Sequence, residues 1–162
     1  MNYLKGGTSL MECYGLDRMS EDIGLDGTDK NGIKKIVESF CQKYGHTYNI
    51  NKDTDTVKRF MIHYENDNHG NEKPLKVEVS YRKRSIGKDL YQIKDGITVY
   101  NINQIAIMKE NTFSNRDKIR DLYDIIFICK NYWDELDKNI KNIFIKEGEV
   151  SPCARTSLRA TL

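Results

Sequence analysis

Two stretches decide the fold of this chain, Lys5-Gly6-Gly7-Thr8-Ser9-Leu10 and, after a short interval, Ser20-Glu21-Asp22-Ile23-Gly24-Leu25-Asp26. The Gly pair predicts a tight turn at which backbone N–H groups can approach a ligand closely. We expect a short helix to follow, from Thr8 to Tyr14. Its N-terminal N–H groups and positive dipole end would face an anion, and phosphate is the natural guest.

The second stretch has the alternation of a β-strand. Ile23 and Leu25 share one face, whereas Asp22, Gly24 and Asp26 share the other. Carboxylates on alternate positions can present a divalent metal ion to the phosphates held by the turn. A Gly pair alone usually marks an ordinary turn, and an acidic strand face is usually just solvated. Their order and separation make the combination more specific than either part.

Composition sets the outer limits. The chain has 162 residues, of which 38% are hydrophobic and 31% charged, so it suits one domain or a core domain with a small appendage. A net charge of +2 gives no global field for nucleic acid. The four cysteines lack CxxC spacing, and no leader or long apolar run is present, so we expect a cytoplasmic protein without a membrane partner.

The middle of the chain predicts an α/β order. Apolar residues at helical spacing predict a helix from Ile33 to Tyr44, which Gly45 would end. Strand-like runs follow at 46–50 and 57–64, and a polar turn at 65–73. In the strand expected over 75–82, Glu78 points away from the apolar layer, as Asp22 does.

Beyond residue 100 the pattern is helical, with candidates at 102–112, 115–131 and 136–144. In the second of these helices Asp121 and Asp124 lie on one side. Taken alone, this would be a solvent-exposed helix with ordinary ion pairs, each contributing about 0.3–0.5 kcal/mol.

We therefore expect a twisted mixed sheet flanked by helices, followed by a small helical subdomain. The expected boundaries are 1–100 for the core, 101–148 for the helical subdomain, and 149–162 for a tail of different composition that is disordered or non-native.

These residues closely resemble the motifs of the AbiEii/AbiGii-type nucleotidyltransferase toxins, within the polymerase-beta-like nucleotidyltransferase superfamily. The first stretch, with Arg18 and the strand of Asp22, is similar to the family's opening motif. Three more stretches look like its later motifs, in the same order and over roughly residues 3 to 130. They are Leu75-Lys76-Val77-Glu78-Val79, Ile105-Ala106-Ile107-Met108-Lys109 and Arg120-Asp121-Leu122-Tyr123-Asp124-Ile125.

The resemblance implies a role for each matching residue. Asp22 and Glu78 would hold catalytic Mg²⁺ or Mn²⁺, and Asp121 would be a third catalytic residue. The cleft would lie between the strands of Asp22 and Glu78 and the helix of Asp121. The residues expected to bind the NTP substrate are Gly6, Gly7, Thr8, Lys109, Arg120 and Asp124.

One position departs from the family pattern, because Gly24 stands where the second Asp of Asp-x-Asp is expected. Asp26 lies on the same strand face but about 7 Å further along, so it would join the metal site only if the strand bulged at Gly24. An alternative is therefore a degenerate or truncated member that keeps the fold and nucleotide binding without chemistry. A plainer alternative is an α/β domain with acidic strands.

The resemblance further implies the toxin half of a bacterial toxin–antitoxin or abortive-infection pair. Such an enzyme would move a nucleotide from an NTP to RNA, with tRNA as the first candidate, or to protein, and a cognate antitoxin protein would be its partner. Arg82, Lys83 and Arg84, near a strand end, could guide an RNA backbone, although a basic cluster at a strand end is more often simply solvated.

Overall fold

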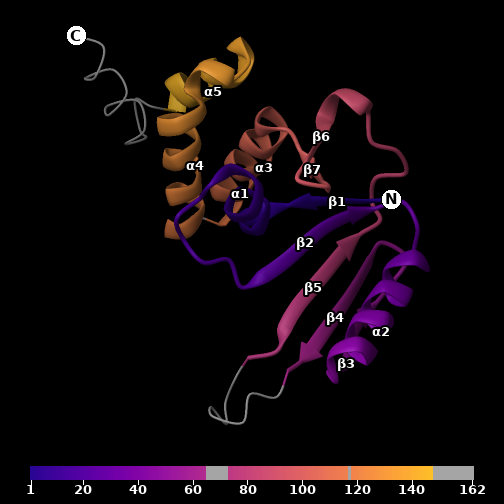
Figure 1. The fold of residues 1–162 in the computed structure, drawn as a ribbon. Coiled ribbons are helices and arrows are strands. Elements are labelled where there is room, and N and C mark those ends of the chain that lie inside the picture. Colours follow the sequence, from indigo (N-terminus) through magenta and orange to yellow (C-terminus); the bar gives the residue numbers. More distant parts are fainter. Residues whose placement is uncertain (65–72, 117, 148–162) are drawn as a thin grey trace. The chain divides into compact units, whose positions relative to one another are not determined.

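The structure is a computed structural model that describes residues 1–64, 73–116 and 118–147 (Figure 1). The chain divides into two compact units, residues 1–99 and 100–162, each described here by itself. The elements of the first unit are β1 (Asn2–Lys5), α1 (Gly6–Tyr14), β2 (Asp22–Gly27), α2 (Gly32–Tyr44), β3 (Thr47–Asp53), β4 (Val57–His63), β5 (Leu75–Ser80), a 3₁₀ turn (Lys88–Leu90), β6 (Tyr91–Lys94) and β7 (Ile97–Tyr100).

The described strands of the first unit form one seven-stranded mixed sheet in the order β3-β4-β5-β2-β1-β7-β6. The strand of Asp22, β2, lies at its centre, antiparallel to β1 and parallel to β5. A β-bulge interrupts the pairing of β3 with β4 between Ile50 and Lys52. The mixed α/β fold expected from the sequence is therefore confirmed.

One face of the sheet is covered by α2. Ile33, Val37 and Cys41 of this helix are buried against strand residues of β4 and β5, including Phe60 and Val79, and Ile23 and Leu25 of β2 pack against the same cluster. Because strand side chains alternate, Asp22, Gly24 and Asp26 lie on the opposite face. The packing of α2 thus fixes which side of the sheet carries the acidic residues.

The second unit contains α3 (Ile102–Arg116), α4 (Ile119–Tyr132), a 3₁₀ turn (Trp133–Glu135) and α5 (Lys138–Glu147). Buried side chains from all three helices include Ile105, Ile128 and Phe144. The helices in the described part of the chain are too short or too polar to cross a membrane.

Two expectations need correction. The strands β6 and β7, which form a hairpin around Asp95 and Gly96, were not expected from the sequence. A helix was expected to begin at residue 115, whereas α3 continues to Arg116 and α4 begins at Ile119. The polar turn at 65–73, apart from Lys73, and the tail at 149–162 lie outside the described residues.

Candidate active site

Asp22 and Glu78 lie on the same face of the sheet, on neighbouring parallel strands. In the register of β2 with β5, Asp22 is opposite Lys76 and Gly24 is opposite Glu78. The two carboxylate-bearing residues are therefore offset by only two residues along adjacent strands. The structure does not place Asp22 and Glu78 on opposite sides of the molecule, an arrangement that would exclude a shared cation.

Each of these carboxylates is paired with a basic side chain. The Lys76 ammonium lies 2.5 Å from Asp22 Oδ2. The guanidinium of Arg59, on the neighbouring strand β4, donates to Glu78 Oε2 from Nη2 at 2.6 Å and from Nε at 2.7 Å. The side chains of Asp22 and Glu78 are 44% and 36% exposed, so both are open to ions from solvent.

This pair of carboxylates suits a magnesium ion. Mg²⁺ prefers hard oxygen ligands and is usually bound through one or two carboxylates, with water and substrate phosphates completing its shell. Within the described residues, no cluster of three or more His, Cys, Asp or Glu side chains forms a ready-made cage. Asp22 and Glu78 are the two half-exposed carboxylates on this face that could hold such an ion together with substrate phosphates.

Gly24 occupies the position between these residues where a further carboxylate is expected. A Cβ built on Gly24 would meet the Lys5 carbonyl oxygen at 3.5 Å and Lys5 Cγ at 3.6 Å, which are ordinary van der Waals distances. Lys5 lies opposite Gly24 in the register of β1 with β2. The site therefore has room for a side chain at position 24, next to the stem of Lys5.

Asp26 has a different environment. It is buried, forms an ion pair with Lys5 and lies 3.7 Å from the Lys83 ammonium. The register of β2 is continuous on both sides, without a bulge at Gly24. Asp26 could reach a cation at Asp22 only through a bulge at Gly24, and the structure has none there. The negative charge of Asp26 is balanced by Lys5 and Lys83.

The Gly-Gly-Thr turn begins α1 as expected. Gly6 has a φ of 80°, which residues with a Cβ adopt only at a cost. A Cβ at Gly7 would lie 2.9 Å from Ser20 Oγ and 3.0 Å from Arg18 Nη2. A methyl group at position 7 would therefore displace the ends of these two side chains.

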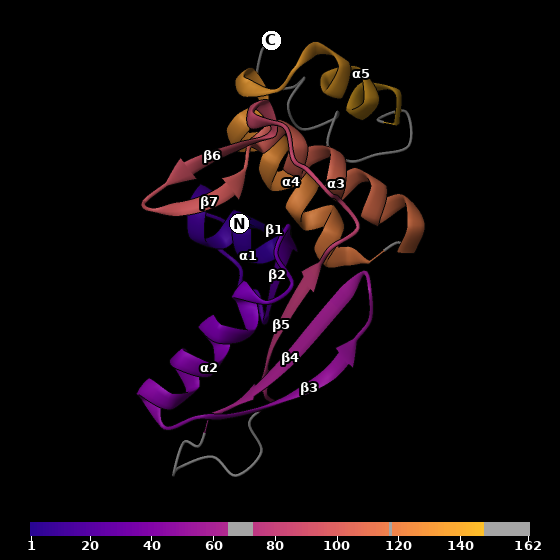
Figure 2. The ribbon, with the colours of Figure 1, turned by 90° about the vertical axis from the view of Figure 1, so that its right-hand side faces the viewer.

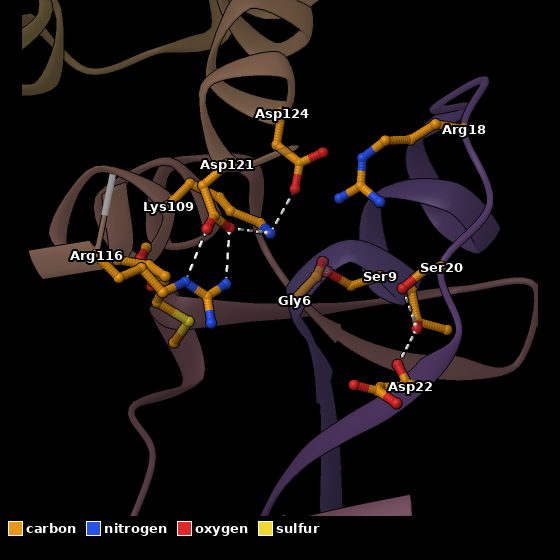
Figure 3. A network of polar contacts seen from close by, with 12 residues as sticks. Gly6, Ser9, Arg18, Ser20, Asp22, Lys109, Arg116, Asp121 and Asp124 are labelled. Atoms are coloured by element: carbon orange, nitrogen blue, oxygen red, sulfur yellow. Dashed lines mark hydrogen bonds and ion pairs between the residues drawn. The ribbon is translucent and has the colours of Figure 1, made fainter. Parts of the chain in front are cut away.

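The hydroxyl of Thr8 ties this turn to the strand of Asp22. It lies 2.9 Å from Ser20 Oγ and donates a hydrogen bond to the backbone carbonyl of Asp22. Figure 3 shows Ser20 and Asp22 next to one another where β2 begins. The first phosphate contact expected of Thr8 is consequently its backbone N–H, because its side chain already holds the start of β2.

The second unit contains a buried ion cluster on α3 and α4 (Figure 3). The Lys109 ammonium lies 2.5 Å from Asp124 Oδ2 and 3.6 Å from Asp121 Oδ1. The Arg116 guanidinium donates to both oxygens of Asp121, at 2.8 and 3.0 Å. Asp121 and Asp124 are 1% and 0% exposed, so a solvent-exposed helix with surface ion pairs is not what the structure shows.

The cluster shifts the pKa values of Asp121 and Arg116. Burial by itself would raise the pKa of Asp121, but the hydrogen bonds from Arg116 and the charge of Lys109 outweigh it, so this pKa is lowered. The pKa of Arg116 is raised, chiefly by its hydrogen bonds to Asp121. Both shifts favour the charged forms of Asp121 and Arg116 at neutral pH.

Sequence reasoning missed the basic partners of the acidic residues. Lys76 has a signal in the sequence, since it stands two residues before Glu78 and must share its face. Arg59 and Arg116 have no such signal. The pairing of Arg59 with Glu78 depends on the register of β4 with β5, and that of Arg116 with Asp121 depends on how α3 meets α4. Arg120, expected to bind nucleotide, lies exposed on α4.

Comparison with known proteins agrees with this geometry. The profile of the family described as "Nucleotidyl transferase AbiEii toxin, Type IV TA system" matches residues 2–161. No match was found among the curated proteins.

Two crystal structures from Helicobacter pylori are similar to the chain over 91% of its length. JHP933 is 31% identical with a TM-score of 0.77, and the match covers 67% of that chain. A "putative nucleotidyltransferase" is 30% identical with a TM-score of 0.76, and the match covers 69% of that chain. With both sequence and fold in agreement, the chain belongs to the AbiEii family of nucleotidyltransferase toxins of type IV toxin–antitoxin systems.

Proposed function

We propose that this chain is a Mg²⁺-dependent enzyme that transfers a nucleotide from an NTP to an RNA acceptor, with tRNA as the first candidate. The observation that carries the proposal is the placement of Asp22 and Glu78 on one face of adjacent parallel strands, both open to solvent. Membership of the nucleotidyltransferase toxin family supplies the reaction class, and the metal and acceptor are our additions.

The side chains divide the work as follows. The Gly6–Gly7 turn and the N-terminal N–H groups of α1 hold the triphosphate. Asp22 and Glu78 hold the cation, and Glu78 also orients the acceptor hydroxyl. A divalent cation bound there would lower the pKa of the attacking hydroxyl and neutralise charge on the phosphates.

We also assign roles in the second unit, on the strength of the motif match. Asp121 is a catalytic residue in this proposal, and Lys109, Arg120 and Asp124 contact the nucleotide or support the site, the buried Lys109 and Asp124 through their ion pair. The burial of Lys109, Asp121 and Asp124 supports a fixed geometry for three of the four.

Transfer of labelled nucleotide tests the proposal directly. Purified chain is incubated with each of the four NTPs, labelled on the α-phosphate, together with Mg²⁺ and total RNA. We expect label in the tRNA fraction, and its loss on adding EDTA or on replacing Asp22 by Asn. Glu21→Gln is the matched control, because Glu21 is an exposed neighbouring acid outside the site.

An active family member is assayed in parallel. If that protein labels RNA while this chain labels neither RNA nor protein, the proposal of an active enzyme is rejected.

A second candidate function is favoured by Gly24, which leaves one expected carboxylate missing beside Glu78. In that case the chain keeps the fold and binds nucleotide without turnover. Gly24→Asp distinguishes the two candidates, because the position has space for a side chain. Turnover that appears only in Gly24→Asp, and not in the isosteric Gly24→Asn, would establish the degenerate state. If the unmodified chain turns over as fast as Gly24→Asp, the degenerate state is excluded.

The biological setting that we propose is bacterial and intracellular, with a cognate antitoxin and a role in abortive infection. Growth arrest on expression, relieved by co-expression of a neighbouring antitoxin gene and by Asp22→Asn, is the expected result.

A further inference from the structure

Within the described residues of the first unit, the part of the sheet formed by β3, β4 and β5 has one face covered by α2. On its other face Arg59, Met61, Lys76 and Glu78 are half-buried, and only the end at Val57 and Ser80 is buried. Figure 2 shows α2 along one side of these strands. The register brings Lys52, Arg59 and Glu78 into one row, and Asn49, Met61 and Lys76 into the next. Thr47 and His63 form a third row. We call these eight residues the open face.

The open face leads directly to the candidate cation site. The row of Lys52, Arg59 and Glu78 continues to Gly24 on β2, and the row of Asn49, Met61 and Lys76 continues to Asp22. Four adjacent strands span about 14 Å at the usual strand spacing. A ligand lying across β3 and β4 would therefore have its end at Asp22 and Glu78.

The charge of the open face is positive although the whole chain is nearly neutral. Three of its side chains are cationic, namely Lys52, Arg59 and Lys76, and one, Glu78, is anionic, which leaves two positive charges. The remaining members are amide, hydroxyl, imidazole and thioether side chains. Asn49 lies 2.7 Å from His63 Nε2 and donates to Asn51 at 3.1 Å, so the polar groups form a connected surface.

Two of these cations are held by the acids of the cation site. Arg59 is bound to Glu78 and Lys76 to Asp22. All four side chains are between 32% and 44% exposed, and ion pairs at such positions are weak and easily exchanged. A divalent cation that takes the two carboxylates would release the guanidinium and the ammonium for other anions.

We propose that the open face binds the acceptor as a single strand of RNA, and that a divalent cation at Asp22 and Glu78 strengthens this binding by releasing Arg59 and Lys76. The inference rests on the proposed function, whose acceptor it places. Cationic side chains contact phosphates, while the amides of Asn49 and Asn51 and the ring of His63 offer partners for 2′-hydroxyls and bases. A protein acceptor would have no comparable need for cations along its path.

Equilibrium binding tests this inference without any turnover. A short fluorescently labelled single-stranded RNA is titrated with the full chain, and anisotropy is recorded with and without Ca²⁺, a hard cation that stands in for Mg²⁺. We expect Ca²⁺ to tighten binding at least fivefold. Combining Arg59→Ala with Lys76→Ala should weaken binding in Ca²⁺ at least tenfold and reduce the slope of log K against log salt by about 1.4.

The matched control combines Lys34→Ala with Lys35→Ala on α2, which removes the same charge from exposed positions on the covered side. This control should change the affinity less than twofold. A charge-conserving variant, Arg59→Lys with Lys76→Arg, should retain binding within about threefold, which guards against a loss of folding. Mn²⁺ binding, followed by electron paramagnetic resonance, should be at least as tight in the alanine variant as in the unmodified chain.

Three results would overturn the inference. They are equal weakening by both alanine pairs, no binding of RNA by the unmodified chain in Ca²⁺, and RNA binding that Ca²⁺ does not strengthen. The second of these would leave protein as the acceptor class. Failure of the labelling assay alone would reject the proposed enzyme while leaving the RNA surface in place, so the two failures are distinguishable.

Discussion

Gly6 and Gly7 are neighbours in sequence, yet the structure requires glycine at each for a different reason. Gly6 has a positive φ with nothing within 4 Å of a built Cβ, so its constraint is backbone conformation. Gly7 has no positive φ, and its constraint is the approach of Arg18 and Ser20. We therefore expect a substitution at Gly6 to affect mainly the stability of the fold, and a substitution at Gly7 to affect mainly ligand binding.

We predict that the two alanine variants affect different properties. Gly6→Ala should lower the free energy of unfolding by about 1–2 kcal/mol, the cost of a left-handed residue with a Cβ. Gly7→Ala should change stability by less than about 1 kcal/mol, since the ends of two side chains can move, but it should weaken NTP binding. Urea unfolding and calorimetric titration measure the two quantities. Equal destabilisation by both variants would contradict this division.

At the same scale, the sequence predicted which face Asp22 and Glu78 occupy but not what they contact. Alternation along a strand fixes the face of a residue relative to its own neighbours, and the apolar residues around Asp22 and Glu78 showed that face clearly. The pairing of Arg59 with Glu78 depends on the register of β4 against β5, which no local pattern encodes. The catalytic and binding roles of these residues remain predictions.

Among the elements, α2 was predicted closely because apolar residues at helical spacing and the terminal Gly45 point to the same helix. The end of α3 was not. The expected helices were divided between residues 112 and 115, within a stretch in which Asn111, Thr112 and Asn115 are poor helix formers. In the structure each donates to the carbonyl four residues earlier, at 2.6–2.7 Å, and the helix continues to Arg116.

The hairpin of β6 and β7 had a signal that was overlooked. Asp95-Gly96 between alternating apolar residues is typical of a two-residue type I′ turn. Both residues have positive φ, 48° for Asp95 and 80° for Gly96, as that turn requires. The hairpin joins the rest of the sheet through β7, whose Val99 pairs with Leu4 of β1.

This turn gives a prediction for the element. Gly96→Ala should destabilise the hairpin by about 1–2 kcal/mol because alanine resists positive φ. Asp95→Asn should be neutral, since Asn tolerates that region. Hydrogen exchange of the amides in β6 and β7 reports the local effect. Unchanged protection in Gly96→Ala would show that the turn does not hold the hairpin together.

For the whole molecule, the two units have cores of different character. The first unit is held by the apolar cluster between α2 and the sheet, whereas the second buries the charged group of Lys109, Asp121 and Asp124. The pKa of Asp121 is lowered in the folded state, so its ionisation stabilises the fold above the unfolded pKa of about 3.9. That contribution is lost as pH falls through the lower folded pKa.

We therefore predict that acid unfolds the second unit first. The single tryptophan, Trp133, belongs to that unit and reports on it. Its fluorescence should change at a higher pH than the far-UV circular dichroism of the sheet. Asp121→Asn should cost about 3–5 kcal/mol at pH 7, because it leaves Arg116 and Lys109 with too little negative charge. It should also flatten the dependence of Trp133 fluorescence on pH, and coincident transitions in the unmodified chain would contradict the prediction.

The space beside Gly24 has an evolutionary consequence. Every glycine codon becomes an aspartate or glutamate codon by one base substitution, and a Cβ at this position makes only ordinary van der Waals contacts. A gene for this protein is thus a single point mutation from encoding another acidic residue beside Glu78. In any population that carries the gene, such variants arise by single substitutions, so selection for or against an acidic residue at this position acts on one nucleotide.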